Sequence, residues 1–236
     1  KCRIYTDGRV PQGVMARIEA AGAEIVFISK HMAGWHPTMW RFAALSDPEA
    51  HTVLIRDVDS PILERETILV GIWANRGNAV HIIRDWYAHT TLILAGLFGL
   101  QGKRLDGLDR SIEAYLERSN HHWGVDQDYL RDVIWPVVAD QALIHDSVFF
   151  GEDHPLAPPN SMSEHIGVSY KMATASTDQS VSAEKFIWVL KDEKTGIDTF
   201  YPAVDQEGRA TIVIPKVVAD GLDADCFSLR LEKQSG

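Results

Sequence analysis

The sequence has little cysteine, a deficit of positive charge and no long apolar run. Its two cysteines, Cys2 and Cys226, lie at opposite ends without the spacing of metal ligands, which predicts free thiols in a reducing, cytoplasmic compartment. Lysine and arginine number 23 against 33 aspartates and glutamates, and the net charge of −10 argues against nucleic-acid binding through a basic surface. No apolar stretch reaches the roughly 18 residues that a membrane-spanning helix needs.

What remains is an ordinary globular composition, with 45% hydrophobic and 24% charged residues over 236 positions. This length suits one large domain, or one domain with a smaller one. Pro155, Pro158 and Pro159 make a linker-like break, so we predict domains at residues 1–153 and 154–236. The chain opens on a predicted strand at Arg3–Thr6 without an initiating Met, and we expect further residues upstream.

Strands and helices alternate along the first domain, which predicts an α/β fold with a parallel sheet and helices on its faces. In such sheets, ligands bind beyond the carboxyl ends of the strands. The second domain has short apolar runs between turn residues, which predicts a small antiparallel β unit. The predicted strands are Arg3–Thr6, Glu24–Ser29, Thr52–Ile55, Ala79–Ile83, Ala142–His145, Lys185–Lys191, Thr199–Val204, Ala210–Pro215 and Cys226–Glu232, and the predicted helices are Val14–Ala21, Pro37–Leu45, Glu64–Trp73, Ser111–Arg118 and Asp126–Val138.

The most informative segment is Thr52–Pro61, in which a β-branched strand runs into Asp57 and Asp59. Burying carboxylates is costly unless a cation or a hydrogen-bond donor offsets the lost hydration. An Asp-x-Asp at the mouth of a buried strand therefore suggests a divalent metal and, beyond it, a phosphate-bearing ligand. The alternative is an acidic turn, with Ser60 and Pro61 as its turn residues.

Polar residues also follow a later strand, at Arg84 and Asp85. Arg84 suits bidentate contact with a phosphate, and Asp85 suits a sugar hydroxyl; the alternative is an ion pair that caps the strand. Gly96 and Gly99 come shortly afterwards. Glycines there let the backbone approach a ligand closely, or they serve tight packing.

Two later segments complete the candidate set. Asp126 and Asp128 begin a predicted helix, where the helix dipole favours acidic side chains. Alternatively, one of them receives an acceptor hydroxyl or a sugar hydroxyl, which makes both candidates for the catalytic carboxylate. His145 ends a short strand. Because an imidazole beside two carboxylates suits a Mn²⁺-type site, we predict that Asp57, Asp59 and His145 converge on one metal ion.

Taken together and in order, several segments resemble bacterial glycosyltransferases of the GT-A type, particularly a group from polysaccharide-related gene neighbourhoods. The resemblance covers roughly residues 1–150. The matching segments are Trp40-Arg41-Phe42, Ile55-Arg56-Asp57-Val58-Asp59-Ser60, Arg65-Glu66, His81-Ile82-Ile83-Arg84-Asp85 with His89, Ala95-Gly96-Leu97-Phe98-Gly99, Gly124-Val125-Asp126-Gln127-Asp128-Tyr129-Leu130, Ile134-Trp135-Pro136 and Ile144-His145-Asp146-Ser147.

The resemblance implies a GT-A (Rossmann-like) mixed sheet with flanking helices, lacking the first strand that usually holds the nucleotide base. It implies a UDP- or GDP-sugar donor, a saccharide or glycoconjugate acceptor, and Mn²⁺ or Mg²⁺ on the donor diphosphate. Asp59 is then a direct metal ligand, Asp57 contacts the ribose or the metal, and His145 completes the metal site. The expected donor-binding residues are Arg56, Asp57, Arg84, Asp85, Gly96 and Gly99.

The β-rich remainder resembles no family that we identify. Its expected core is Phe186, Trp188, Val189, Phe200, Ile212, Ile214, Phe227 and Leu229. Its hypothetical role is homo-oligomerisation or acceptor positioning, because it contains no plausible metal or acid–base set.

Two other interpretations stay open. Haloacid-dehalogenase-like phosphatases also place Asp-x-Asp after a buried strand, with the first Asp as nucleophile, but they have Thr or Val where this chain has Pro61. A degenerate sugar-binding or scaffold module is the other alternative. Metal-dependent binding of UDP separates the three, while the donor sugar, the acceptor and the stereochemistry of transfer are left open.

Overall fold

The computed structural model of the chain describes residues 1–102, 105–147, 155–159, 164–170, 172–180, 186–206 and 209–233. The chain divides into two compact units. The sheet unit is Ser29–Ser169, and the β-rich unit combines Lys1–Ile28 with Tyr170–Gly236. The domain boundary predicted between residues 153 and 154 lies outside the described residues. The N-terminal segment, expected in the first domain, thus groups with the C-terminal strands.

A four-stranded mixed sheet is the centre of the sheet unit, in the order β3-β5-β4-β6. Strand β5 (Leu97–Gln101) runs antiparallel to both of its neighbours, β3 (Thr52–Arg56) and β4 (Val80–Arg84), whereas β6 (Ala142–Asp146) runs parallel to β4. The prediction of an α/β fold with a mixed sheet is therefore confirmed, whereas the parallel sheet inferred from the alternation of elements is wrong at β5. The glycine-containing sequence of β5 lacks the alternating pattern by which a strand is recognised.

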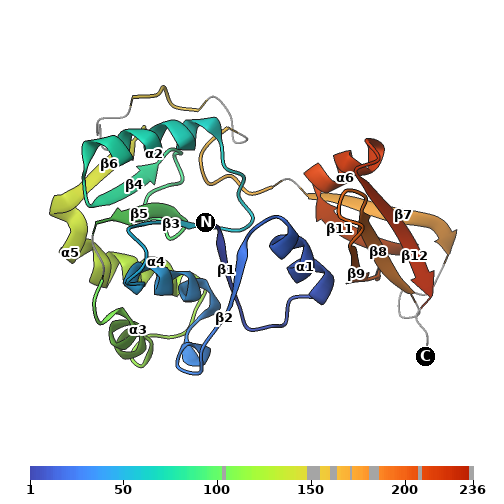
Figure 1. Cartoon of the computed structure of the whole chain (residues 1–236), viewed down its shortest axis with the longest axis horizontal. Helices are drawn as coiled ribbons and strands as arrows, with labels where there is room; N and C mark the ends of the chain where they lie inside the picture. The colour runs from blue at the N-terminus through green and yellow to red at the C-terminus, as the bar shows by residue number, and fades with distance from the viewer. Residues whose placement is uncertain are drawn as a thin grey trace. The chain divides into compact units, whose positions relative to one another are not determined.

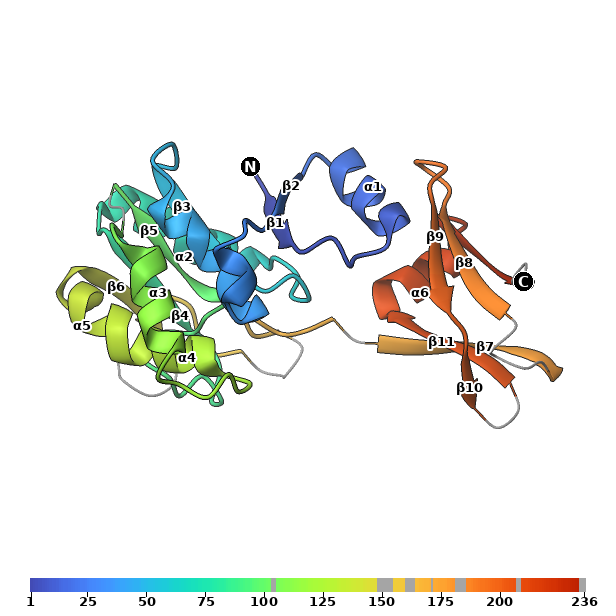
Figure 2. The same cartoon turned by 90° about the horizontal axis from the view of Figure 1, so that it is seen from below.

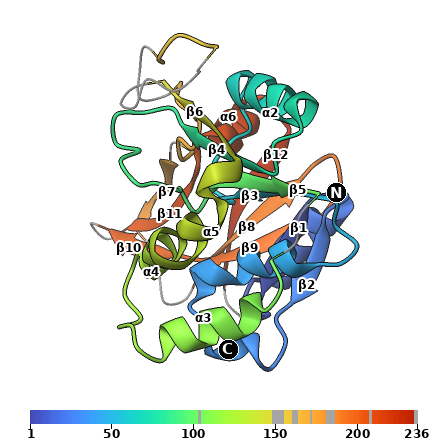
Figure 3. The ribbon, with the colours of Figure 1, turned by 90° about the vertical axis from the view of Figure 1, so that its left-hand side faces the viewer.

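Helices cover both faces of this sheet (Figure 1). In Figure 3, α2 (Glu64–Arg76) lies above β4 and β5, and α4 (Val125–Tyr129) and α3 (Leu108–Leu116) lie below them. Trp73 of α2 and Phe42 of η2 are fully buried on opposite sides, and burying each ring contributes about 2–3 kcal/mol. The elements of the unit besides the strands are η1 (Met32–Gly34), η2 (Pro37–Ser46), α2 (Glu64–Arg76), α3 (Leu108–Leu116), α4 (Val125–Tyr129), the π-helical turn η3 (Leu130–Ile134), α5 (Trp135–Val138) and η4 (Ala139–Gln141).

The pleat of the sheet decides which side chains of β3 can meet which helix. Leu54 pairs with Gly99, which lies against Trp73, whereas Ile55 pairs with Phe98, which contacts Phe42. Because side chains alternate between faces along a strand, Leu54 and Arg56 face α2. Ile55, and Asp57 after it, face η2 and α4.

The β-rich unit contains antiparallel sheets in the orders β10-β11-β7 and β12-β8-β9, and the parallel pair β1-β2. Helix α6 packs on β7, β11 and β12 (Figure 2), and its Val218 and Leu222 join Trp188, Ile212 and Ile214 in the core. The elements are β1 (Arg3–Thr6), α1 (Gln12–Ala20), β2 (Glu24–Phe27), β7 (Met172–Ser180), β8 (Phe186–Asp192), β9 (Asp198–Pro202), β10 (Val204–Gln206), β11 (Arg209–Pro215), α6 (Lys216–Asp223) and β12 (Phe227–Lys233).

Helix α1 of the N-terminal segment packs against the C-terminal strands within this unit. A Cβ atom on Gly13 would lie 2.1 Å from the Asp198 carbonyl oxygen, so the backbones of α1 and β9 touch there. Arg17 extends over the Phe227 ring, 5.3 Å from its centroid. The prediction of a small β-rich core is correct for Trp188, Val189, Ile212 and Ile214, but wrong for Phe200, whose exposed fraction is 49%.

Among the described residues, no helix combines the length and the apolar character needed to cross a membrane.

Candidate functional site

The Asp-x-Asp segment forms the turn that follows β3. The Ser60 N–H donates to the Asp57 carbonyl oxygen at 3.4 Å, which closes the turn. The Asp57 side chain is 47% exposed, and Asp59 is exposed with its Oδ2 accepting a hydrogen bond from Ser169 Oγ at 3.0 Å. Both carboxylates therefore lie at the carboxyl edge of the sheet with open sides, as the sequence predicts.

Arg41 of η2 joins this turn to a distant part of the chain. Its Nη1 donates to Asp57 Oδ1, and its Nη2 donates to Asp126 Oδ2 at 2.8 Å. We call Arg41, Asp57 and Asp126 the Arg41 cluster. One guanidinium thus holds two carboxylates that come from the end of β3 and the start of α4.

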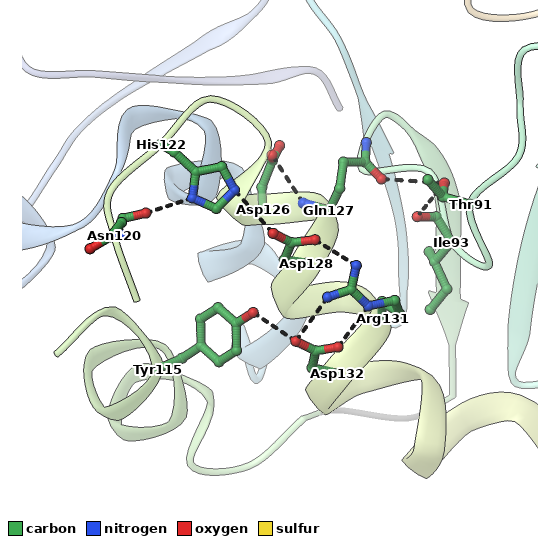
Figure 4. Close-up of polar contacts among 10 residues, drawn as sticks. All are labelled: Thr91, Ile93, Tyr115, Asn120, His122, Asp126, Gln127, Asp128, Arg131 and Asp132. Carbon is green, nitrogen blue, oxygen red and sulfur yellow. Dashed lines mark hydrogen bonds and ion pairs between the residues drawn. The ribbon is translucent and has the colours of Figure 1, made fainter. Parts of the chain in front are cut away.

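Asp126 is positioned by the local structure at the start of α4. Gly124, whose φ of 95° is in the left-handed region, turns the chain into the helix at low steric cost. The Gln127 N–H donates to Asp126 Oδ1 at 3.0 Å (Figure 4). With the Gln127 carboxamide oriented to satisfy both neighbours, it donates to the Ile93 carbonyl oxygen at 2.9 Å and accepts from the Ala95 N–H at 3.0 Å. The start of α4 is thereby tied to the loop before β5.

Asp128 does not join the Arg41 cluster. Its Oδ2 meets His122 Nε2 at 3.0 Å and its Oδ1 meets Arg131 Nη1 at 2.6 Å, in a surface network that continues to Asp132 and Tyr115 (Figure 4). Burial and the hydrogen bond to Asp132 raise the pKa of Tyr115 to about 12. Of the two candidate catalytic carboxylates, the structure therefore brings only Asp126 to Asp57.

Arg84 and Asp85 lie in buried ion pairs, which agrees with the strand-capping alternative. Arg84 Nε is 2.9 Å from Asp146 Oδ2, and these side chains are 3% and 0% exposed. Asp85 is fully buried and receives two hydrogen bonds from Arg65, at 2.6 and 3.1 Å, and a third from the Ile166 N–H at 3.0 Å. Both side chains are thus too buried in this conformation to contact a nucleotide-sugar donor.

Of the other residues predicted to bind the nucleotide-sugar donor, Arg56 and Gly99 have structural contacts, and Gly96 lies against Asp57. Arg56 faces α2, where its Nε lies 3.0 Å from Glu66 Oε1, and burial raises the pKa of Glu66. Gly99 is a packing glycine, since an added Cβ would lie 2.7 Å from the Val53 carbonyl oxygen. Gly96 belongs to the site in an unexpected manner: an added Cβ would lie 1.9 Å from Asp57 Oδ2, so Gly96 leaves room for the carboxylate.

His145 is not brought to Asp57 and Asp59. It lies in β6, and two strands stand between β6 and β3. At the usual spacing of neighbouring strands, β6 is therefore about 14 Å from β3. Its ring is on the face of α2, where its Nδ1 meets His81 Nε2 at 2.8 Å. Burial, and then the neighbouring His145, lower the pKa of His81 to about 3, so this histidine is neutral in the core at ordinary pH.

The predicted three-residue metal site is therefore not assembled, and no group of three His, Cys, Asp or Glu side chains within the described ranges is placed as a metal site. Asp57 and Asp59 still offer what a hard divalent cation uses. Mg²⁺ is commonly held by one or two carboxylates together with substrate phosphates, and the open sides of these two carboxylates fit that arrangement. Mn²⁺ or Mg²⁺ stays a prediction that rests on Asp57 and Asp59.

Comparison with protein-family models, curated proteins and solved structures finds no match to this chain.

Sequence reasoning assigned no role to two contributors to the site. Arg41 stands in the apolar run Met39–Leu45, and a lone arginine in such a run needs a carboxylate partner when it is buried, which is the signal that could have identified it. Ser169 gives no comparable signal. It reaches Asp59 only because the segment at 164–170 lies across the turn, where Ser60 Oγ also donates to the Gly167 carbonyl oxygen at 3.3 Å.

Proposed function

We propose that the sheet unit is a metal-dependent glycosyltransferase of the GT-A type, which moves a sugar from a nucleotide-sugar donor to a saccharide or glycoconjugate acceptor. The observation that carries the proposal is the Arg41 cluster. A carboxylate of the Asp-x-Asp turn and a carboxylate at the start of α4 both pair with the Arg41 guanidinium. This cluster lies at the sheet edge where ligands of α/β proteins bind. The mixed sheet is consistent with the proposed fold.

The Asp-x-Asp turn is the proposed donor side of the site. Asp57 and Asp59 would hold Mn²⁺ or Mg²⁺ together with the oxygens of the donor diphosphate. When bound, the metal ion neutralises the negative charge of the leaving nucleoside diphosphate. Ser169 steadies Asp59 through its hydrogen bond of 3.0 Å, and Gly96 leaves space for Asp57.

Asp126 is the proposed acceptor side. Its Oδ2 is held by Arg41 and its Oδ1 by the Gln127 N–H, so the carboxylate has a fixed orientation beside the donor side. In that position it would accept the proton of the acceptor hydroxyl as the new glycosidic bond forms, or bind a hydroxyl of the donor sugar. Asp128, paired with His122 and Arg131, has no part in this step.

Calorimetric titration with UDP and with GDP, with and without Mn²⁺, tests the proposal. A transferase of this type binds one of the nucleotides only when the metal is present. Asp57→Asn should weaken that binding at least about tenfold, the loss of one charged interaction. Asp128→Asn, a matched change outside the Arg41 cluster, should leave it unchanged. A scaffold would bind neither nucleotide, and a phosphatase would release phosphate from simple esters without binding UDP.

A further inference from the structure

The Arg41–Asp57 pair is more exposed than the two arginine–aspartate pairs at the end of β4. In the pairs Arg84–Asp146 and Arg65–Asp85 the carboxylate is completely buried. In the Arg41–Asp57 pair the two side chains are 21% and 47% exposed. A buried pair loses a great deal when it separates, whereas exposed pairs are worth little. The contact between Arg41 and Asp57 can therefore be exchanged for another at low cost.

The second carboxylate of Arg41 is held differently. Asp126 is only 7% exposed at its side chain, and its other oxygen is bound by the Gln127 N–H. The buried Nε of Arg41 has no hydrogen-bond partner in the part of the chain that the structure describes. Arg41 is thus anchored firmly at Asp126, weakly at Asp57, and retains an unused donor.

We propose that Arg41 is a cation that exchanges places with the metal at Asp57. Before the nucleotide sugar binds, the guanidinium of Arg41 neutralises the Asp57 carboxylate. With a divalent cation and a nucleoside diphosphate bound, Asp57 would hold the metal ion, and Arg41, still paired with Asp126, would turn its released N–H groups to the phosphate oxygens. This inference rests on the proposed function, and it assigns Arg41 as a nucleotide-binding residue that makes metal and nucleotide bind together.

The physical basis is charge. The Arg41 cluster carries two carboxylates and one guanidinium, so a metal ion binding alone has to displace a like charge from Asp57. A metal ion that arrives with a diphosphate offers the displaced guanidinium a new anion, and a charge-assisted contact of arginine to phosphate is strong. Arg41 should therefore oppose binding of the bare metal and favour binding of the metal–nucleotide complex.

The test is Arg41→Gln in the full-length chain, with Mn²⁺ binding measured by electron paramagnetic resonance and UDP or GDP binding by calorimetry at saturating Mn²⁺. The variant should bind Mn²⁺ alone about two- to fivefold more tightly, the value of an exposed ion pair. It should bind the nucleotide at least about tenfold more weakly, since a charged hydrogen bond is lost. Arg131→Gln is the matched control, because Arg131 also bridges two aspartates, Asp128 and Asp132, but lies outside the cluster.

Changes in opposite directions distinguish this role from a structural one, because a damaged fold cannot tighten Mn²⁺ binding. If Arg41→Gln weakens both affinities, or changes neither, the exchange is refuted while the proposed function stands. If the unmodified protein binds no nucleotide in the presence of Mn²⁺, both are refuted. Arg41→Lys keeps the charge but lacks the two separate nitrogens with which Arg41 holds Asp57 and Asp126, so it provides the same test with intermediate values should the glutamine variant fold poorly.

Discussion

Gly96→Ala is the substitution whose effect the structure defines most sharply. The new Cβ would lie 1.9 Å from Asp57 Oδ2, 2.6 Å from Asp57 Cγ and 3.2 Å from the Asp57 backbone nitrogen. The backbone contact needs a shift of only a few tenths of an ångström. The carboxylate has to move by more than about 1 Å to reach ordinary van der Waals separation, and it can do so because its side chain is 47% exposed.

The expected cost in stability is modest and the expected cost in binding is large. Crowding of this kind lowers the free energy of unfolding by about 1–2 kcal/mol, toward the low end for overpacking because a half-exposed side chain yields. A displacement of about 1 Å at a binding group can reduce function by about 100-fold. We therefore expect Mn²⁺-dependent nucleotide binding to fall at least about tenfold, measured by calorimetry, with urea denaturation reporting stability.

Gly71→Ala in α2 is the matched control. No atom lies within 4 Å of the position of its Cβ, and alanine stabilises a helix interior by about 0.5–1 kcal/mol relative to glycine. This variant should be slightly more stable than the unmodified protein and bind the nucleotide equally well. The reasoning about Asp57 is refuted if Gly96→Ala behaves like Gly71→Ala in both measurements.

Three further outcomes are expected. Asp126→Asn should reduce sugar transfer at least about 100-fold through loss of a general base, with nucleotide binding changed little, whereas Asp128→Asn should change transfer less than about twofold. Burial, and then a neighbouring histidine, lower the pKa of His89 to about 4 from 6.5, so the unfolded chain binds more protons between these values. The contribution of His89 to the free energy of unfolding is therefore complete above about pH 6.5 and declines toward pH 4 by up to about 1.4 kcal/mol per pH unit. His89→Gln should reduce this dependence on pH, measured by urea titrations at pH 7 and 5. Gly13→Ala should destabilise the β-rich unit by about 1–3 kcal/mol, because its Cβ would meet the Asp198 carbonyl oxygen at 2.1 Å, and limited proteolysis should then cut the N-terminal segment faster.

A different result in any of these experiments would contradict the contact on which that prediction rests. Equal losses of transfer in Asp126→Asn and Asp128→Asn would contradict the assignment of Asp126. An unchanged pH slope in the His89 variant would show that this histidine is not held neutral. Unaltered proteolysis in Gly13→Ala would mean that α1 does not rest on β9 as described.

The sequence by itself determined the local elements and the location of the turn after β3. Periodicity and turn residues predict β3, β4, β6 and α2 close to their observed bounds, and so too β1, β2, β8, β9, β11 and β12 of the β-rich unit, because these signals are local. The strands β7 and β10 were not predicted. The sequence also placed Asp57 and Asp126 among the candidate residues. Propensity could not reveal that Leu97–Gln101 is a strand or which way it runs, or that Lys1–Ile28 groups with Tyr170–Gly236, since these features depend on contacts between residues far apart in the chain.

Only the tertiary structure decided which candidates meet. The pleat of β3 turns Arg56 toward α2 and Asp57 toward η2, and strand order separates Asp57 from His145; neither fact is contained in the spacing of residues. Burial assigns Arg84 and Asp85 to ion pairs, although the same residue types at a strand end would equally suit a ligand. A sequence shows which side chains carry chemistry, but convergence on one guanidinium is a property of the folded chain, because it joins segments whose proximity no local signal encodes.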